Sequence, residues 1–389
     1  MTFTAERNSF SPVKLTKMKR IVIAVLGIAA LVVGYFMFVQ KGNNTENATA
    51  QPDEQSIEES RPTMRVERGD AATLWPAEQV VENPTPTNWL ALMQTGETPR
   101  LTAEQAEAYV TANKRSAESL LAAYRTTRDR AYLREALEKF PNDPKVNFDG
   151  CIDALFYSKD DYTTEERRTL LTRFEKTAPG NSLANYLAAS DHFKSGESDK
   201  ALEQFRNAAT KSSLNDYSIE FIQNAEEAFR NAGYSEADAK GIASWNLPLP
   251  HLQQLRQAGV DLLELAGRFQ QSGDEAQARE ARQLALHLAD MLQDGSQQKL
   301  QMNQSYGISI ENKVLATLDP NSAYDNSGRT VQQRIDELAQ NKTKIIADIS
   351  SLENLLPRMT AADQSAFFDR IRIYGETSAN EWAIGKYGN

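Results

Sequence analysis

The sequence predicts an all-α protein. Apolar residues recur at helical spacing over most of the 389-residue chain, capping residues precede several of these segments, and Gly or Pro follows them. Hydrophobic residues make up 40% of the chain and charged residues 25%, as in ordinary globular proteins. The formal net charge is −10, and residues 1–20 carry five basic residues and one acid, a net of +4, so the remainder carries −14. This acidic body predicts no nucleic-acid partner, which would require clustered Lys and Arg.

The first predicted element is an apolar run from Ile21 to Val39, which has no charge over 19 residues. As a helix it would be about 28 Å long, close to the hydrocarbon thickness of a bilayer. Basic residues precede the run and acidic residues follow it, so the positive-inside rule puts residues 1–20 in the cytoplasm. The sequence therefore predicts a single-pass inner-membrane protein, anchored through residues 21–39, with a periplasmic body. A signal peptide cleaved near Ala50 is the alternative, although the run exceeds the usual length of about 7–15 residues.

A flexible linker is predicted next, over residues 41–100. Its first half is polar, acidic and poor in aromatic residues, so it cannot bury enough apolar surface to fold. Its second half is an extended segment whose tryptophans, Trp75 and Trp89, are expected to dock on the folded body. The rest of the chain divides into a helical repeat domain, residues 101–293, and a C-terminal helical region, residues 294–389.

The segment FKSGESDKALEQFRNAA, residues 193–209, predicts the core of a helical hairpin. A first helix, from about Leu183 to Lys194, would end at Gly196, because glycine takes the left-handed conformation at low cost. The second helix carries small or aromatic residues at +5, +9 and +12 from this glycine, where small side chains let two helices approach closely: Ala201, Phe205 and Ala208.

The same pattern returns along the chain. Gly273 is followed by Ala278 and Ala285 at the matching offsets, with Arg282 in place of the aromatic residue, and Gly233 gives a weaker match. Upstream, capping residues and prolines delimit two more units, with Asp143 before Pro144 in one and Thr163 before Glu166 in the other. The five units are spaced by about 34–40 residues.

This pattern resembles the tetratricopeptide repeat over about residues 109–292. The resemblance implies an α-solenoid of about five helical pairs, in which the first helix of each pair lines a concave groove for a peptide or a partner helix. Carried onto this sequence, it assigns these groove positions: Tyr186, Ser190, Phe193, Lys194, Leu263, Gly267, Gln270 and Gln271. The alternative is an irregular helical bundle with the same number of helices.

Residues 331–356 predict a long helix with a heptad seam. Apolar residues recur alternately four and three positions apart, with one charged interruption: Val331, Ile335, Leu338, Lys342, Ile345, Ile349, Leu352 and Leu356. The seam is either a coiled coil, which would make a homodimer, or a long helix that packs on the rest of the chain. Thr360 and Asp363 then predict the cap of a further helix.

The sequence predicts no catalytic residue, no cofactor and no metal site. Metalloprotease, hydrolase and nucleotide-binding motifs are missing. His192, His251 and His287 are the three histidines, and His192 falls at a helix position where a packed or partly exposed side chain is expected. Cys151, the one cysteine, lies among apolar neighbours and is expected to be a buried structural thiol.

The predicted function is therefore non-catalytic. We expect a scaffold that binds a protein or peptide partner in the envelope, similar in layout to membrane-anchored bacterial tetratricopeptide proteins that assist secretion or envelope assembly. One alternative is an envelope hydrolase whose catalytic residues are dispersed along the chain. Another is a dimeric structural spacer held together by residues 331–356.

Overall fold

The computed structural model describes residues 89–91 and 99–388, and in this part of the chain it contains helices and no β-strand. The predicted all-α fold class is confirmed for these residues. In chain order the helices are α3 (Ala103–Ala112), α4 (Ala117–Thr127), α5 (Arg130–Lys139), α6 (Pro144–Ile152), α7 (Thr164–Thr177), α8 (Leu183–Lys194), α9 (Ser198–Ala209), α10 (Ser218–Asn231), α11 (Glu236–Trp245), α12 (Pro250–Gln271), α13 (Glu275–Gln293), α14 (Gln301–Leu315), α15 (Val331–Leu355), α16 (Ala361–Tyr374) and α17 (Glu376–Tyr387).

The membrane prediction is corrected. Within residues 89–91 and 99–388, no helix combines the length and the apolar character that crossing a bilayer requires. The predicted span, residues 21–39, lies outside the described residues, as do the tail 1–20 and nearly all of the linker 41–100. The predicted placement at an inner membrane, with a cytoplasmic N-terminus and a periplasmic body, is therefore not retained.

Local sequence signals set the helix ends. The Asp143 carboxylate accepts hydrogen bonds from the backbone at the start of α6, where Pro144 is the first residue. Thr163 and Glu166 form the predicted capping box at the start of α7. After α8, Gly196 has a φ of +75°, the left-handed conformation expected there. α8 has the predicted bounds, and α9 contains the three residues predicted for the second helix of the hairpin.

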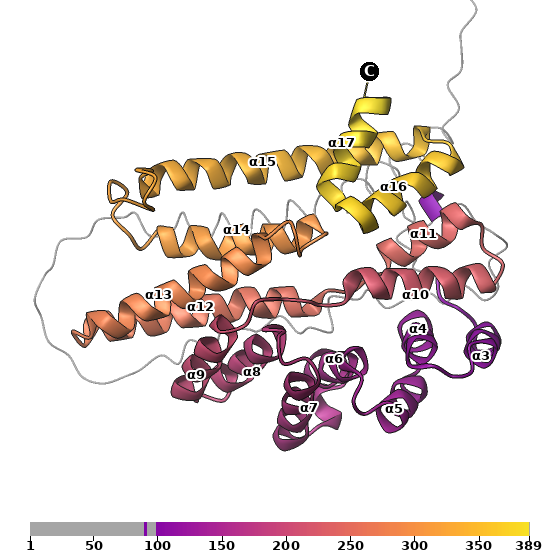
Figure 1. Ribbon diagram of the computed structural model, residues 1–389, viewed down its shortest axis with the longest axis horizontal. Coiled ribbons are helices and arrows are strands. Elements are labelled where there is room, and N and C mark those ends of the chain that lie inside the picture. Colours follow the sequence, from indigo (N-terminus) through magenta and orange to yellow (C-terminus); the bar gives the residue numbers. More distant parts are fainter. Residues whose placement is uncertain (1–88, 92–98, 389) are drawn as a thin grey trace, which may run out of the picture. The chain divides into compact units, whose positions relative to one another are not determined.

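Consecutive helices pack in pairs. The pairs are α4 with α5, α6 with α7, α8 with α9, α10 with α11, and α12 with α13. Two later helices also pack on the first helices of earlier pairs, since α10 contacts α4 and α12 contacts α8. Figure 1 shows α10 and α12 running across these shorter helices. The first helices of two pairs are thus covered by later helices of the same chain.

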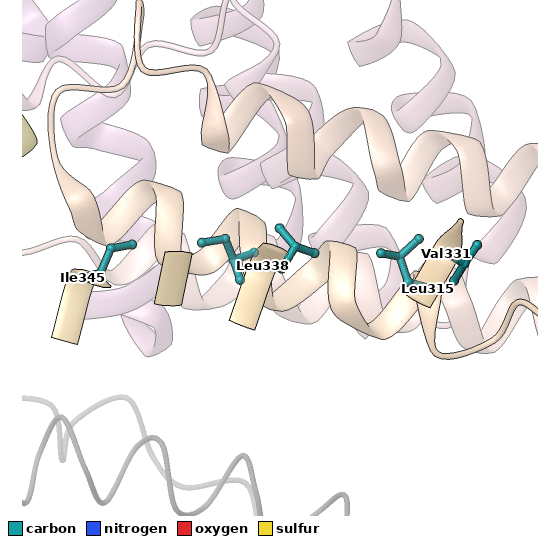
Figure 2. Close-up of a cluster of buried hydrophobic side chains, with 5 residues drawn as sticks. Leu315, Val331, Leu338 and Ile345 are labelled. Atoms are coloured by element: carbon teal, nitrogen blue, oxygen red, sulfur yellow. The ribbon is translucent and has the colours of Figure 1, made fainter. Parts of the chain in front are cut away.

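The heptad seam is buried within the chain. Val331, Leu338 and Ile345 of α15 form one buried cluster with Ile308 and Leu315 of α14. Figure 2 shows Leu338 and Ile345 continuing the line that begins at Leu315 and Val331. The seam therefore packs on α14, as the second of the two predicted interpretations requires.

The last two helices, α16 and α17, connect α15 to α11. α15 also packs on α17, α17 packs on α16, and α16 packs on α11. Thr360 caps α16, as predicted, by accepting a hydrogen bond from the backbone N–H of Asp363.

Candidate functional site

The predicted groove residues differ widely in exposure. Tyr186 and Ser190 are fully buried. The half-buried positions are Phe193, Leu263 and Gly267, and the exposed ones are Lys194, Gln270 and Gln271. The side chains of Tyr186 and Ser190 belong to the core, so they do not form part of a surface that a partner could contact.

The structure does not bring the predicted groove residues of α8 and those of α12 together on one surface. Nζ of Lys194 donates a hydrogen bond of 2.8 Å to Oε1 of Gln254, near the start of α12. Gln270 lies sixteen residues further along the same helix, a distance of about 24 Å at 1.5 Å per residue. Because α12 packs on α8, it covers the face that the resemblance assigned to a ligand. These residues do not line one groove.

A cluster of polar side chains is buried where α4, α6, α10 and α12 meet. α4 and α6 supply residues from their C-terminal halves, the turn before α10 supplies an aspartate, and α12 supplies its second residue. We call this cluster the buried junction: Tyr124, Arg125, Asp149, Asp153, Asp216 and His251. Apart from His251, these residues were not singled out from the sequence.

An ion pair between Arg125 and Asp149 joins α4 to α6. Nε of Arg125 donates to Oδ2 of Asp149 at 2.8 Å, and Nη2 donates to Oδ1. The Arg125 and Asp149 side chains are 10% and 2% exposed, and the guanidinium lies 3.3 Å from the centre of the Phe221 ring in α10. Burial raises the pKa of Asp149 against the opposing charge of Arg125. The pair therefore carries a large desolvation cost.

Asp153, the residue that follows α6, lies one turn after Asp149, so the two carboxylates lie on the same side of this helical segment. It accepts hydrogen bonds from Oη of Tyr124 at 3.0 Å and from Nε of Arg130 at 3.0 Å. A short π-helix, Asp153–Tyr157, begins at this residue, and such turns are frequent at functional sites. Asp153 thus ties the end of α6 to α4 and to the start of α5.

A third acid, Asp216, holds the start of α12. Oδ2 of Asp216 accepts a hydrogen bond of 3.1 Å from Nε2 of His251, and Oδ1 accepts one of 3.0 Å from the backbone N–H of Ser218. Burial opposes the charge on this carboxylate, but the hydrogen bonds outweigh burial and hold the pKa of Asp216 at about 2. The intervening residue, Tyr217, has a φ of +55°, which is uncommon for a residue with a side chain.

The space inside the buried junction is too small for a substrate. The cavity measures about 10 Å³, room for one water molecule. Its unpartnered polar atoms among the described residues include Nδ1 of His251 and Oγ of Ser218. Residues 89–91 and 99–388 contain no group of three His, Cys, Asp or Glu arranged to hold a metal ion. The arrangement suits a structural connection between helix pairs.

Two single-residue predictions can be compared with the structure. Cys151 is buried, and burial raises the pKa of its thiol, as expected of a structural cysteine. His192 is half-buried, and its Nδ1 lies 2.8 Å from Oε2 of Glu197, in agreement with the packed or partly exposed side chain predicted for it.

The buried junction did leave a signal in the sequence. In NFDGCIDALF, Asp149 and Asp153 stand four residues apart inside an otherwise apolar run. Charged residues in such a run are buried only when they are paired. That pattern predicts buried partners for both acids, although it does not say that Tyr124, Arg125 and Arg130 are those partners.

Comparison with known proteins finds no match to this chain among protein-family models, curated proteins or solved structures.

Proposed function

We propose that this chain is a non-catalytic scaffold, built from tetratricopeptide-like helical hairpins, that binds a protein or peptide partner. The observation that carries the proposal is the interior of the α8–α9 hairpin. Ala201, Phe205 and Ala208 are each 0% exposed. Gly196 supplies the left-handed turn between the two helices.

The α12–α13 hairpin supports the same interpretation. Ala278 and Ala285 are 0% exposed, and Gly273 has a φ of +82°. Arg282, which replaces the aromatic residue, is half-buried and donates a hydrogen bond from Nη2 to Oε1 of Gln270. The departure from the repeat pattern therefore falls at the edge of the hairpin and leaves its small-residue contact intact.

The proposed binding surface is the exposed face of the hairpins. In this chain α10 and α12 cover the first helices α4 and α8, so the concave face of the repeat is not the surface we propose. The second helices keep one polar face open, as in α9, where Glu203 and Asn207 are exposed while Leu202 and Phe205 are buried. A partner that recognises the hairpins would contact such faces.

The two alternatives receive less support. A hydrolase with dispersed catalytic residues would find its acids and its histidine in the buried junction, but the cavity there has room for one water molecule. A dimeric spacer would need the seam of α15, whose residues Val331, Leu338 and Ile345 are buried against α14.

Crosslinking in cells tests the proposal, with the full chain as bait. One variant combines Glu203→Gln with Asn207→Lys on α9. The control combines Gln340→Lys with Asn341→Lys on the exposed face of α15, so both variants raise the net charge by two. We expect the wild type and the control to recover the same protein and the α9 variant to lose it. Recovery of no specific partner by any bait would overturn the proposal. Equal recovery by all three would move the binding surface away from α9.

A further inference from the structure

Trp89 is buried in a slot between α11 and α16. Its side chain is 3% exposed, although the residue lies far from both helices in the sequence. Gly241 of α11 forms one wall, where an added Cβ would lie 2.3 Å from Cδ2 of the indole. Phe368 of α16 meets the indole edge-on, with ring centroids 5.3 Å apart and an interplanar angle of 71°. The slot therefore fits a flat aromatic group and leaves no space for a side chain at position 241.

Two directed hydrogen bonds hold this tryptophan. Nε1 of the indole donates to Oε1 of Gln364 at 2.9 Å. The backbone N–H of Trp89 donates to Oδ1 of Asp238, also at 2.9 Å. One bond is specific for the indole, because Phe and Leu have no side-chain N–H. The bond to Asp238 is specific for a residue whose backbone N–H is not already used in a helix or a strand.

Both acceptors are fixed in place by their own partners. Nε2 of Gln364 donates to the carbonyl oxygens of Leu356 and Met359 at 3.2 and 3.4 Å, which leaves Oε1 facing the indole. Oδ2 of Asp238 accepts a hydrogen bond from Oγ of Ser235, which leaves Oδ1 for the main chain. A preorganised amide and a preorganised carboxylate thus converge on the two N–H groups of one residue.

We propose that the slot between α11 and α16 is a recognition site for a tryptophan-bearing peptide, and that Trp89 is its intramolecular occupant. This inference rests on the proposed scaffold function and names the class of its partner. The partner presents a tryptophan whose backbone N–H is free to donate to Asp238, as the N–H of Trp89 does. Because a tethered occupant acts at an effective concentration of about millimolar order, a partner gains access by competing with Trp89.

The test supplies the occupant in trans to the full chain. Trp89→Gly empties the slot, and the probe is a fluorescein-labelled peptide with the sequence of residues 84–94, PTPTNWLALMQ. Fluorescence anisotropy should show saturable binding to the Trp89→Gly chain. Binding to the wild type should be about 10-fold weaker or more, because its slot is filled. A peptide with Phe in place of Trp should also bind about 10-fold more weakly or worse, because Gln364 is then left without its donor.

Two further variants keep the test decisive. Adding Gly241→Leu to Trp89→Gly fills the slot and should abolish binding while the circular dichroism of the helices is retained. If Trp89→Gly does not fold, Trp89→Phe takes its place, since its weaker tethered occupant should be displaced by the Trp peptide. A folded Trp89→Gly or Trp89→Phe chain with Gly241 intact that binds neither peptide, or that binds the Phe and Trp peptides equally, overturns the inference. If the peptide binds but crosslinking in cells captures no partner, the proposed function is overturned, while the assignment of the slot as a tryptophan-binding site is retained.

Discussion

The α8–α9 hairpin and the buried junction are held together by different interactions. In the hairpin, the helices meet through small and aromatic side chains, and Tyr186 and Phe205 stack edge-on with ring centroids 5.4 Å apart. In the junction, the helices meet through charged and polar side chains, such as the buried ion pair of Arg125 with Asp149. Apolar contacts tolerate changes in partner, whereas a buried charge depends on one specific neighbour. The hairpin therefore behaves as a local unit, while the junction fixes how α10 and α12 sit on α4 and α6.

The largest effect is expected from Asp149→Ala in the buried junction. The change leaves the Arg125 guanidinium buried without its carboxylate, which should lower the free energy of unfolding by about 4 kcal/mol. Urea denaturation of the full chain measures it. Glu280→Ala is the control, because its pair with Arg206 is exposed and should contribute less than about 1 kcal/mol.

Removing both charges sharpens the comparison. Because burial already opposes the charge on Asp149, the double variant Arg125→Met/Asp149→Leu should recover most of the loss and unfold within about 1 kcal/mol of the wild type. A double variant as unstable as Asp149→Ala alone would mean that the polar contacts themselves, and not their mutual neutralisation, stabilise the junction.

In the hairpin, Phe205→Ala should lower the free energy of unfolding by about 3 kcal/mol, because the residue is fully buried and its removal leaves a cavity. Phe193→Ala is the matched control. Phe193 touches the same cluster, with its ring centroid 6.2 Å from that of Phe205, but it is half-buried. Equal losses in the two variants would contradict the assignment of Phe205 to the centre of the hairpin.

The buried junction should also respond to pH through Asp216. The pKa of Asp216 is about 2 in the folded chain and near 4 when unfolded. A lowered pKa contributes stability above pH 4, and this contribution is lost as the pH falls from 4 toward 2. At pH 7 it amounts to about 3 kcal/mol, since each pKa unit corresponds to about 1.4 kcal/mol. The difference in unfolding free energy between the wild type and Asp216→Asn should therefore shrink as the pH is lowered over this range. A difference that stays constant down to pH 3 would show that Asp216 has an ordinary pKa.

The two regions also differ in how far the sequence predicted them. The bounds of α8, Leu183 and Lys194, follow from local signals, since Gly196 and the apolar spacing lie within the hairpin itself. The junction joins Arg125 to Asp149 and Asp216 to His251. The apolar run around Asp149 indicates that this acid is buried with a partner, but no local pattern identifies the partner residue. The predicted groove residues do not form one surface for the same reason. α12 packs on α8, although the contacting residues Lys194 and Gln254 lie 60 residues apart in the sequence.

The seam of α15 was predicted less completely than the hairpin but more completely than the junction. Its apolar period predicted which side chains are buried, and Val331, Leu338 and Ile345 are buried. The period could not show whether the helix that covers the seam belongs to a second copy of the chain or to the same chain. The seam has the same apolar spacing in both cases. The covering residues, Ile308 and Leu315, belong to α14.

The smallest predicted effect concerns the turn that separates the helices of a hairpin. Gly273 has a φ of +82°, and no atom lies within 4 Å of the position that a Cβ would take there, so Gly273→Ala has only a conformational cost, which should be about 1 kcal/mol. Gly267, six residues earlier within α12, also has open space around its Cβ position but lies in ordinary helix. There the same change should stabilise the chain by about 0.5–1 kcal/mol, because Ala favours the helix over Gly. Thermal unfolding of the two variants should therefore shift in opposite directions. Shifts of the same sign would contradict the left-handed turn, and with it the local signal that defines the hairpins.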